Sequence, residues 1–398
     1  MRGPCRLAAV GLSCSLGSRP GDVWGRLFDA SAEPLSLRDD LVRGKSRHFA
    51  QVTDSLPEIP SGLERYGCRN NRIALRAYEA IRPAVDAAIE RYGAHRVGVV
   101  AGSSTAGVAE AEAAVLEWRR SGTLPEGFDL LQLEYGGVSE FLSEVGGLGG
   151  PSYALSTACS TGAKALASAR RLLDMNLCDA VVAGAVDSLC ALTANGFEGL
   201  KALSPERTNP MSANRAGLNL GEGGALFLVT REPGGISLAG VGESSDAHHI
   251  SAPDPAGVGA EASMQAALDD ASISSEQIAY LNLHGTGTRQ NDQMESIAVD
   301  RVFRASPPCS STKPLLGHTL GAAGALEAAL CWLMLENCVD GTMRVPPHRY
   351  DGIRDEGLPS LDLVGDGDMV AVEGATYVMS NSFGFGGSNC TLILRSDG

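Results

Sequence analysis

The sequence predicts an α/β fold with mixed or parallel sheets. Apolar runs of strand length alternate along the chain with longer segments of helical periodicity, and such alternation is typical of β-α-β units. The 398 residues suffice for two or three domain-sized units, whose cores need no disulfides or structural metals. The 49 glycines favour tight turns and closely packed elements.

The expected elements follow one another in a regular order. Strand segments are short apolar runs that end in Gly, Ser or Thr; we expect them at 6–12, 96–101, 179–186, 225–229, 236–241, 279–283, 376–380 and 391–394. Helix segments are longer and rich in Ala and Leu; we expect them at 108–119, 161–175, 260–271 and 321–338.

Short internal similarities predict two related halves. RLAAVGLS near the start is similar to ISLAGVGES after residue 235, and HRVGVVAGSST is similar to IAYLNLHGTGT. ACSTGAKALASARRLL is similar to HTLGAAGALEAALCWL in the same order along the chain. The turn-forming sequence EPGG at 232–235 separates the copies, so we expect one half at 1–232 and the other at 236–398.

Charge and cysteine usage exclude several classes of function. The net charge of −15 argues against general binding to nucleic acid or anionic lipid. The ten scattered cysteines form no C-x-x-C pair or zinc-spaced cluster, which predicts reduced thiols, a cytoplasmic protein and no metal site. The apolar run at the N-terminus is interrupted by Gly11, so it favours a strand over a signal peptide. The stretch 320–335 is too short for a membrane span and contains Glu327.

The strongest local motif is STACSTGA at 156–163. Its Cys159 follows a strand-like segment and opens a helix. Free N–H groups and the positive end of the helix dipole favour a thiolate there and predict a lowered pKa for Cys159. Most cysteines are nevertheless buried and inert, so this motif alone favours a structural Cys.

Three further motifs carry reactive groups. HGTGT at 284–288 contains His284, KPLLGH contains Lys313 and His318, and NSFGFGGSN at 381–389 offers exposed N–H groups on a glycine-rich loop. A satisfied His, a helix cap and a glycine-rich hairpin are the structural alternatives. Signatures for nucleotide phosphates, Ser hydrolases and zinc proteases are absent from the sequence. Together the four motifs supply a thiol, two imidazoles, a lysine and backbone donors, which suits acyl transfer followed by carbanion chemistry.

In this order the four motifs resemble those of the elongating β-ketoacyl-acyl-carrier-protein synthases, and the resemblance runs from the first strand to the last. It implies the thiolase-like fold, a duplicated α/β/α/β/α arrangement of five layers. It implies that Cys159 accepts an acyl chain from a carrier protein. His284 and His318 would then stabilise the enolate formed when malonyl-carrier protein loses carbon dioxide, so that a decarboxylative Claisen condensation yields 3-ketoacyl-carrier protein without a cofactor.

The resemblance also assigns supporting roles. Lys313 orders the site electrostatically, and a buried lysine is expected to pair with an acid. The N–H groups of Cys159 and Phe385 would form the oxyanion hole, and Phe385 would gate the acyl pocket. The remaining supporting residues are Glu327, Asp292, Glu295, Phe383 and Gly384.

Departures from the family pattern favour a specialised member. Arg289 stands where the family commonly has Pro, and the segment NPMSANRAGL at 209–218 lacks two acids and two aromatics of the family motif. We therefore expect a secondary pathway, such as one for aryl polyenes or polyketides, over housekeeping fatty-acid synthesis. Thr105 replaces a bulky apolar residue of the acyl pocket, which would leave room for a rigid or unsaturated chain.

The resemblance implies two kinds of partner, an acidic acyl carrier protein and a second subunit. The basic residues at the family's docking positions are Arg69, Arg72, Arg119, Arg120, Lys201 and Arg207. The dimer is either a homodimer or a heterodimer with a chain-length-factor-like subunit, in which this chain is the active partner. The alternatives are a thiolase or an initiating synthase acting on CoA esters, and a non-catalytic partner or scaffold subunit.

Overall fold

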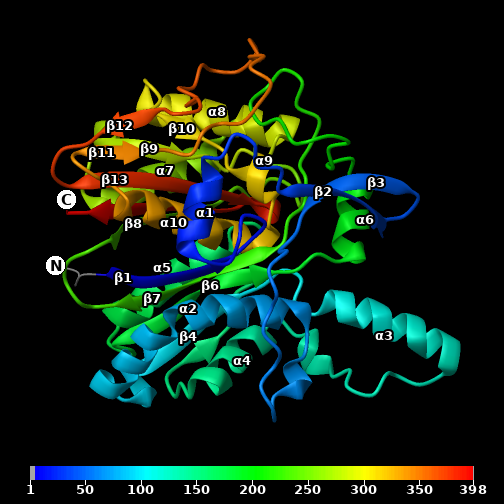
Figure 1. Cartoon of the computed structure of the whole chain (residues 1–398). Coiled ribbons are helices and arrows are strands. Elements are labelled where there is room, and N and C mark those ends of the chain that lie inside the picture. Colours follow the sequence, from blue (N-terminus) through cyan, green and yellow to red (C-terminus); the bar gives the residue numbers. More distant parts are fainter. Residues whose placement is uncertain (1–4, 398) are drawn as a thin grey trace.

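A computed structural model of the chain describes residues 5–397, which form one large mixed sheet flanked by helices (Figure 1). The strand order in that sheet is β10-β9-β13-β14-β8-β1-β7-β6-β4-β5. The strands are β1 (Arg6–Ser13), β4 (Val97–Gly102), β5 (Ser152–Tyr153), β6 (Ala180–Asp187), β7 (Gly223–Thr230), β8 (Ser237–Ser245), β9 (Ile278–Asn282), β10 (Cys309–Ser310), β13 (Thr376–Gly384) and β14 (Ser388–Ser396).

The sheet is built from two half-sheets with the same connectivity. One half-sheet has the order β5-β4-β6-β7-β1 and the other has the order β10-β9-β13-β14-β8. In each, the first three strands are parallel and the last two pairings are antiparallel. The half-sheets meet where Arg6 of β1 pairs with Ser237 of β8. The repeated strand order confirms the predicted duplicated fold.

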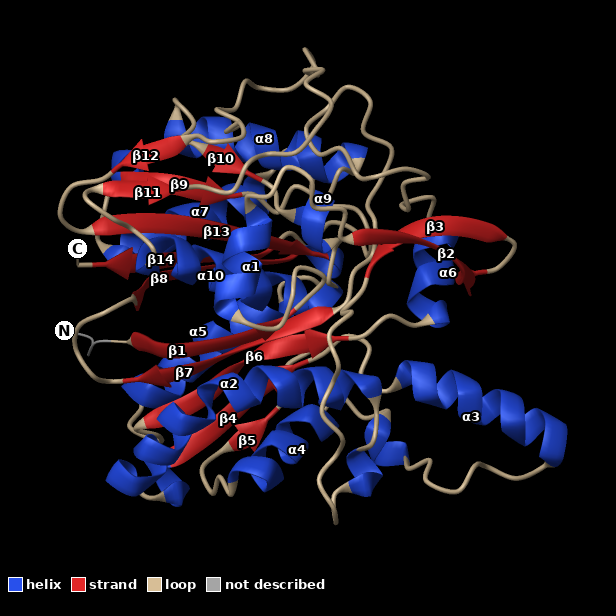
Figure 2. Ribbon diagram, in the orientation of Figure 1, coloured by secondary structure: helices blue, strands red, loops and turns tan. Residues whose placement is uncertain are grey.

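Helices cover both outer faces and fill the space between the half-sheets, giving five layers (Figure 2). The middle layer is α5 (Thr161–Asp174) with α10 (Ala323–Glu336). One outer layer is α2 (Arg69–Tyr92) with α4 (Gly137–Gly146), and the other is α7 (Val258–Ala271) with α8 (Arg289–Phe303). Helix α10 is buried along almost its whole length, as expected of an apolar helix between two sheets.

Two glycines let the central helices cross closely. A Cβ atom at Gly162 of α5 would lie 2.5 Å from the backbone nitrogen of Ala325 in α10. A Cβ atom at Gly324 of α10 would lie 2.8 Å from the backbone nitrogen of Ala163 in α5. Because real Cβ atoms do not approach backbone so closely, only glycine fits at this crossing. The crossing brings the first turns of the two helices together, and the motifs that contain Cys159 and His318 lie there.

All the predicted strands and helices are present, with shifted ends. The last predicted helix begins at Ala323 rather than at 321, because Leu320–Ala322 forms a 3-10 turn. Elements that the sequence analysis missed are α1 (Pro20–Leu27), α2, α4, α6 (Ala191–Gly199), α8, α9 (Lys313–Leu316), the hairpin of β2 (Leu35–Val42) and β3 (Lys45–Ala50), and the short strands β5, β10, β11 (Thr342–Arg344) and β12 (Met369–Ala371).

Helix α3 (Val108–Ser121) projects from the side of the molecule, below α6 in Figure 1. Its outer half exposes Val115, Leu116 and Trp118, and Trp118 is 52% accessible. Within residues 5–397, no helix combines the length and the apolar character that crossing a bilayer requires.

Candidate active site

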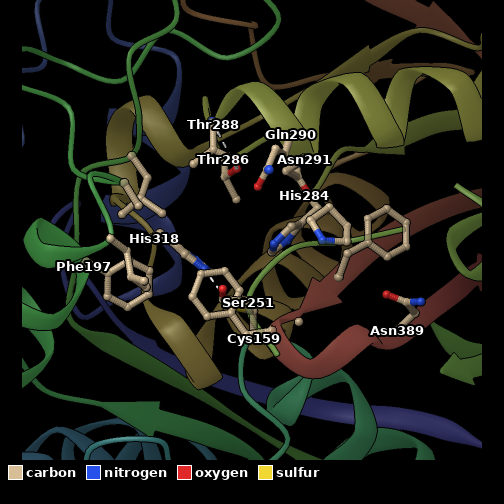
Figure 3. Close-up of a pocket in the computed structure, with 17 residues that line it drawn as sticks. Cys159, Phe197, Ser251, His284, Thr286, Thr288, Gln290, Asn291, His318 and Asn389 are labelled. Carbon is tan, nitrogen blue, oxygen red and sulfur yellow. Dashed lines mark hydrogen bonds between the residues drawn. The ribbon is translucent and has the colours of Figure 1, made fainter. Parts of the chain in front are cut away.

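Cys159 lies in the turn between β5 and α5, two residues before the helix begins at Thr161 (Figure 3). Ala158 adopts a left-handed conformation with φ of 52°, which is uncommon for a residue with a side chain. This turn places Cys159 in a pocket at the crossing of α5 and α10, where the residue is only 5% exposed.

Two imidazoles share this pocket with the thiol. The Nε2 atom of His318 lies 3.0 Å from the Sγ atom of Cys159. The rings of His284 and His318 meet edge to face, with centroids 5.3 Å apart. Phe383 packs against His284 at a centroid distance of 5.9 Å. The three predicted catalytic residues thus converge from three separate motifs.

The predicted lowering of the Cys159 pKa is wrong. Burial raises the pKa of this thiol to about 11, although the backbone N–H of Phe385, the charge of Lys313 and the N–H of Cys159 itself all lower it. Removal from water penalises the thiolate by more than these groups stabilise it. Cys159 is therefore a thiol at neutral pH and needs a base, and the neighbouring Nε2 atom of His318 is placed to accept its proton.

Both imidazoles are neutral at pH 7. Burial holds the pKa of His284 and that of His318 well below the ordinary value, and the positive charge of Lys313 lowers both further. A neutral imidazole can accept a proton through one nitrogen and donate one through the other. This pair can therefore serve as base or as hydrogen-bond donor without adding a buried charge.

Lys313 forms a fully buried ion pair with Glu327 of α10. The lysine side chain is 1% exposed and the glutamate side chain 2%. Asp292 and Glu295, the other two acids expected to support the site, lie at the base of the HGTGT loop, where they accept hydrogen bonds from backbone N–H groups and from side-chain amides. Glu295 is close enough to Lys313 for that positive charge to act on it.

These two carboxylates fix the loop that carries His284. Glu295 accepts hydrogen bonds from the N–H groups of His284 and Gly285, both at 2.7 Å. Asp292 accepts them from Gly287 at 3.2 Å and from Met211 at 2.8 Å. Burial raises the pKa of Glu295 to about 7, against the lowering effect of its backbone donors. The buried carboxylates therefore act by positioning the imidazole.

The glycine-rich loop closes over the thiol. A Cβ atom at Gly384 would lie 3.0 Å from the carbonyl oxygen of Thr157 and 3.2 Å from the nitrogen of Cys159, so a larger residue would push the loop away from the thiol by a few tenths of an ångström. The next residue, Phe385, is 37% exposed and stacks on Phe197 of α6 at 5.5 Å. Phe197 was missed because its role depends on the position of α6, and an aromatic ring in a short helix carries no local signal.

The pocket that opens above Cys159 is lined by both apolar and polar side chains (Figure 3). Its apolar residues include Phe197, Leu200 and Phe385. The other lining residues include Ser251, Thr286, Thr288, Gln290, Asn291 and Asn389. Such a lining suits a linear chain with amide groups that leads to an acyl thioester.

The predicted docking residues differ in whether their charges are already paired within the chain. Arg69 binds the buried carboxylate of Glu222, and Arg72 binds Glu58 and two backbone carbonyls. Arg207 pairs with Glu33. Arg119, Arg120 and Lys201 are exposed and make no ion pair within the described part of the chain. Lys201 also lines a surface groove that shares Leu200, Ala202, Thr288 and Gln290 with the catalytic pocket.

Thr105 lies outside the lining of the catalytic pocket. It is completely buried, its hydroxyl donates to Asp187 at 2.9 Å, and it accepts from the N–H of Ser188 at 3.1 Å. Its predicted effect on the acyl chain stays a prediction.

Among residues 5–397, one group of side chains could hold a metal ion. The ligand atoms of Cys159, His284 and His318 all lie within 4.8 Å of one another. Thiolate and imidazole are ligands that zinc accepts, so the site itself has the donor set for such an ion. The sequence expectation of a reaction without metal or cofactor stays a prediction.

The fold and the site define a condensing enzyme of the ketosynthase type, and comparison with known proteins agrees. Residues 69–233 match the N-terminal domain of β-ketoacyl synthases, and residues 236–342 match the C-terminal domain. The 3-oxoacyl-[acyl-carrier-protein] synthase 2 of Coxiella burnetii is 31% identical over 414 residues, covering 98% of this chain and 97% of that protein. The chain therefore belongs to the β-ketoacyl synthase family.

Two further relatives place it within that family. A chain of the complex between the ketosynthase ApeO and its chain length factor ApeC, from Xenorhabdus doucetiae, is 41% identical and superimposes with a TM-score of 0.93 over 99% of this chain and 98% of that chain. Nodulation protein E of Rhizobium meliloti is 36% identical over 261 residues, and the match spans 63% of this chain and 63% of that relative.

Proposed function

We propose that the chain is a decarboxylating β-ketoacyl-acyl-carrier-protein synthase. The observation that carries this proposal is the 3.0 Å contact between His318 Nε2 and Cys159 Sγ, beside a second neutral imidazole at His284. A buried nucleophile next to a base, with a second neutral imidazole that can join that base as a hydrogen-bond donor, is the set that acyl transfer and enolate formation require.

In the first half-reaction Cys159 takes an acyl chain from its carrier protein. The sulfur attacks the thioester carbonyl carbon while His318 accepts the thiol proton. The N–H groups of Cys159 and Phe385, both close enough to affect the sulfur, stabilise the oxyanion that forms. As the carbon–sulfur bond to the carrier breaks, His318 returns the proton to the departing thiolate.

In the second half-reaction malonyl-carrier protein enters the same pocket. Its carbon–carbon bond to the carboxylate breaks, carbon dioxide leaves, and the electron pair forms an enolate whose oxygen accepts hydrogen bonds from His284 and His318. The enolate carbon attacks the acyl group on Cys159. The bond between that acyl group and the sulfur then breaks, releasing 3-ketoacyl-carrier protein and a thiolate that takes a proton from water.

We further propose that the active form is a heterodimer with a chain-length-factor-like subunit in a specialised polyene or polyketide pathway. The likeness to a chain of the complex between the ketosynthase ApeO and its chain length factor supports this assembly. So does the surface of α3 and the loop after it, where apolar side chains stand in solvent: Val115, Leu116, Trp118, Leu124, Leu130 and Tyr135. Such a patch is typical of a subunit interface.

Thiolase chemistry is less well supported, because it would need a second thiol at the pocket. Cys390 is the nearest candidate in the sequence, but it lies inside β14, is fully buried and has a pKa raised by burial to about 12. All ten cysteines are free thiols. This suits a reducing compartment, and we place the proposed reaction in the cytoplasm.

Intact-mass spectrometry tests the proposal. Wild type and Cys159→Ala are each mixed with acyl-carrier protein and then with malonyl-carrier protein. We expect an acyl adduct on the wild type alone, discharged with release of carbon dioxide when malonyl-carrier protein is added. A wild type that forms no adduct with any acyl donor, alone or with its co-purified partner subunit, would favour the scaffold alternative.

A further inference from the structure

Helix α6 begins without a capping side chain of its own, and a residue of α3 supplies the cap. The N-cap residue of α6, Cys190, makes no side-chain hydrogen bond to the helix backbone at this end. The carboxylate of Glu112 instead accepts the N–H groups of Ala191, at 3.1 Å, and of Leu192. A carboxylate at this position satisfies two free donors and complements the positive end of the helix dipole.

The other end of α6 carries half of the pocket gate. Phe197 lies six residues beyond Ala191, which corresponds to about 9 Å along a helix. Its ring stacks on Phe385 at 5.5 Å with an angle of 22° between the ring planes. Ala194, midway between the two ends, is completely buried against the cluster that includes Leu189 and Leu203. Glu198, the neighbour of Phe197, pairs with Lys45 and Arg47 of the β2–β3 hairpin. In a helix of nine residues that is held in this way, we expect a change at the first turn to reach Phe197 as a shift of the whole helix.

Helix α3 connects the capped first turn of α6 to the surface of the protein. Glu112 lies on the inner part of the helix, and the exposed Leu116 and Trp118 lie one to two turns further along. A subunit that packs on those apolar side chains would restrain α3, and through Glu112 it would restrain the first turn of α6.

We propose that Glu112 is a positioning residue that couples the subunit interface on α3 to the Phe197–Phe385 gate over Cys159. The inference rests on the proposed function for the identity of the docked subunit and of the gated pocket. Its consequence is that the docked subunit narrows the opening of the gate, so that Cys159 is more accessible in the unpartnered chain.

Hydrogen exchange and thiol labelling of the full chain test this coupling. In Glu112→Ala we expect amide exchange to rise about five-fold in segment 189–199, the size typical of a lost helix cap, and to rise also in segment 383–389. Alkylation of Cys159 by iodoacetamide should accelerate in parallel. Glu112→Gln should restore part of the protection, because its amide oxygen still accepts one N–H group. Addition of the partner subunit should slow exchange and alkylation in the wild type more than in Glu112→Ala.

Glu117 provides the matched control. It lies on the same helix, and its side chain is exposed and makes no hydrogen bond or ion pair within the described residues. Glu117→Ala should exchange and react like the wild type. The coupling is overturned if segment 189–199 opens in Glu112→Ala while segment 383–389 and Cys159 behave as in the wild type. If Glu112→Ala does not fold, the same comparison is decided with Glu112→Gln. Neither hydrogen exchange nor thiol labelling needs carrier protein, so the result of this test does not depend on the outcome of the condensation assay.

Discussion

The imidazole of His318 lies 3.0 Å from the sulfur of Cys159, yet burial holds the pKa of that sulfur at about 11. Proximity to an imidazole therefore does not create a resting thiolate here. Both side chains are buried and the pKa of His318 is depressed. Transfer of the thiol proton to His318 would therefore place two charges in a poorly solvated pocket. We therefore expect the proton to move as the acyl group arrives, and we expect the resting thiol to be less prone to oxidation than a thiolate would be.

The pH dependence of alkylation tests this view of the thiol. Because the thiolate is the reactive form, the rate of Cys159 modification by iodoacetamide should rise about ten-fold per pH unit between pH 7 and 9. Labelling of Cys159→Ala, measured in parallel by mass spectrometry, removes the contribution of the partly exposed Cys338. A rate that reaches a plateau near neutral pH would mean that His318 stabilises a thiolate at rest.

Removal of one partner of the Lys313–Glu327 pair should destabilise the fold. Lys313→Met leaves Glu327 buried without a counter-charge, and loss of one member of such a pair typically costs about 3–5 kcal/mol. The double variant Lys313→Met with Glu327→Leu should regain most of that stability in urea denaturation. Its release of carbon dioxide from malonyl-carrier protein should stay low, because the charge beside both imidazoles is gone. A double variant as unstable as the single one would contradict this account of the pair.

The side chains that the structure brings together around Cys159 could be selected from the sequence because they lie in motifs with unusual composition. Cys159 opens an Ala-rich helix, and His284 and His318 lie in glycine-containing loops that packing alone explains poorly. The fold class was equally accessible, since buried strands leave clear apolar runs. Helix α2 was not predicted, because its pattern is interrupted by Pro83 and begins with a pair of asparagines that are buried.

The remainder of the site depends on tertiary placement. The sign of the Cys159 pKa shift is decided by burial, which no local pattern reveals. The contact between Phe197 and Phe385 joins residues 188 positions apart in the chain, and the cap that Glu112 provides for Ala191 joins residues 79 positions apart. The same holds for Arg69, which looked like a free surface charge but lies against Glu222.

The crossing of the two central helices should be intolerant of a single methyl group. Gly162→Ala would place a Cβ atom 2.5 Å from the backbone of Ala325, and overpacking of this kind costs about 1–3 kcal/mol. It should also lower acyl transfer, since the crossing sets the distance between Cys159 and His318. The control is Gly25→Ala on the exposed face of α1, where the methyl group meets open space. That variant should be stabilised by about 0.5–1 kcal/mol in thermal or urea denaturation.

His348 should make stability fall as the pH falls. Its Nδ1 atom accepts the N–H of Ser311 at 3.1 Å and its Nε2 atom lies 2.9 Å from the carbonyl oxygen of Pro210, so the folded state holds a neutral ring. Burial lowers the pKa of His348 from 6.5 to about 4. The unfolded chain therefore binds the proton more tightly, and the stability contributed by the neutral ring is present above pH 6.5 and is lost as the pH falls toward 4.

Urea denaturation at pH 7.5 and 5.5 measures this effect. Both values lie above the pH at which the net charge of the protein is lowest. From His348 alone the wild type should lose roughly 1 kcal/mol between these values, and His348→Gln should lose that much less. The buried His284 and His318 are present in both proteins, so the difference between the two losses of stability isolates the contribution of His348. If the two proteins lost the same stability between these pH values, the pKa of His348 would have to be the same in the folded state as in the unfolded chain.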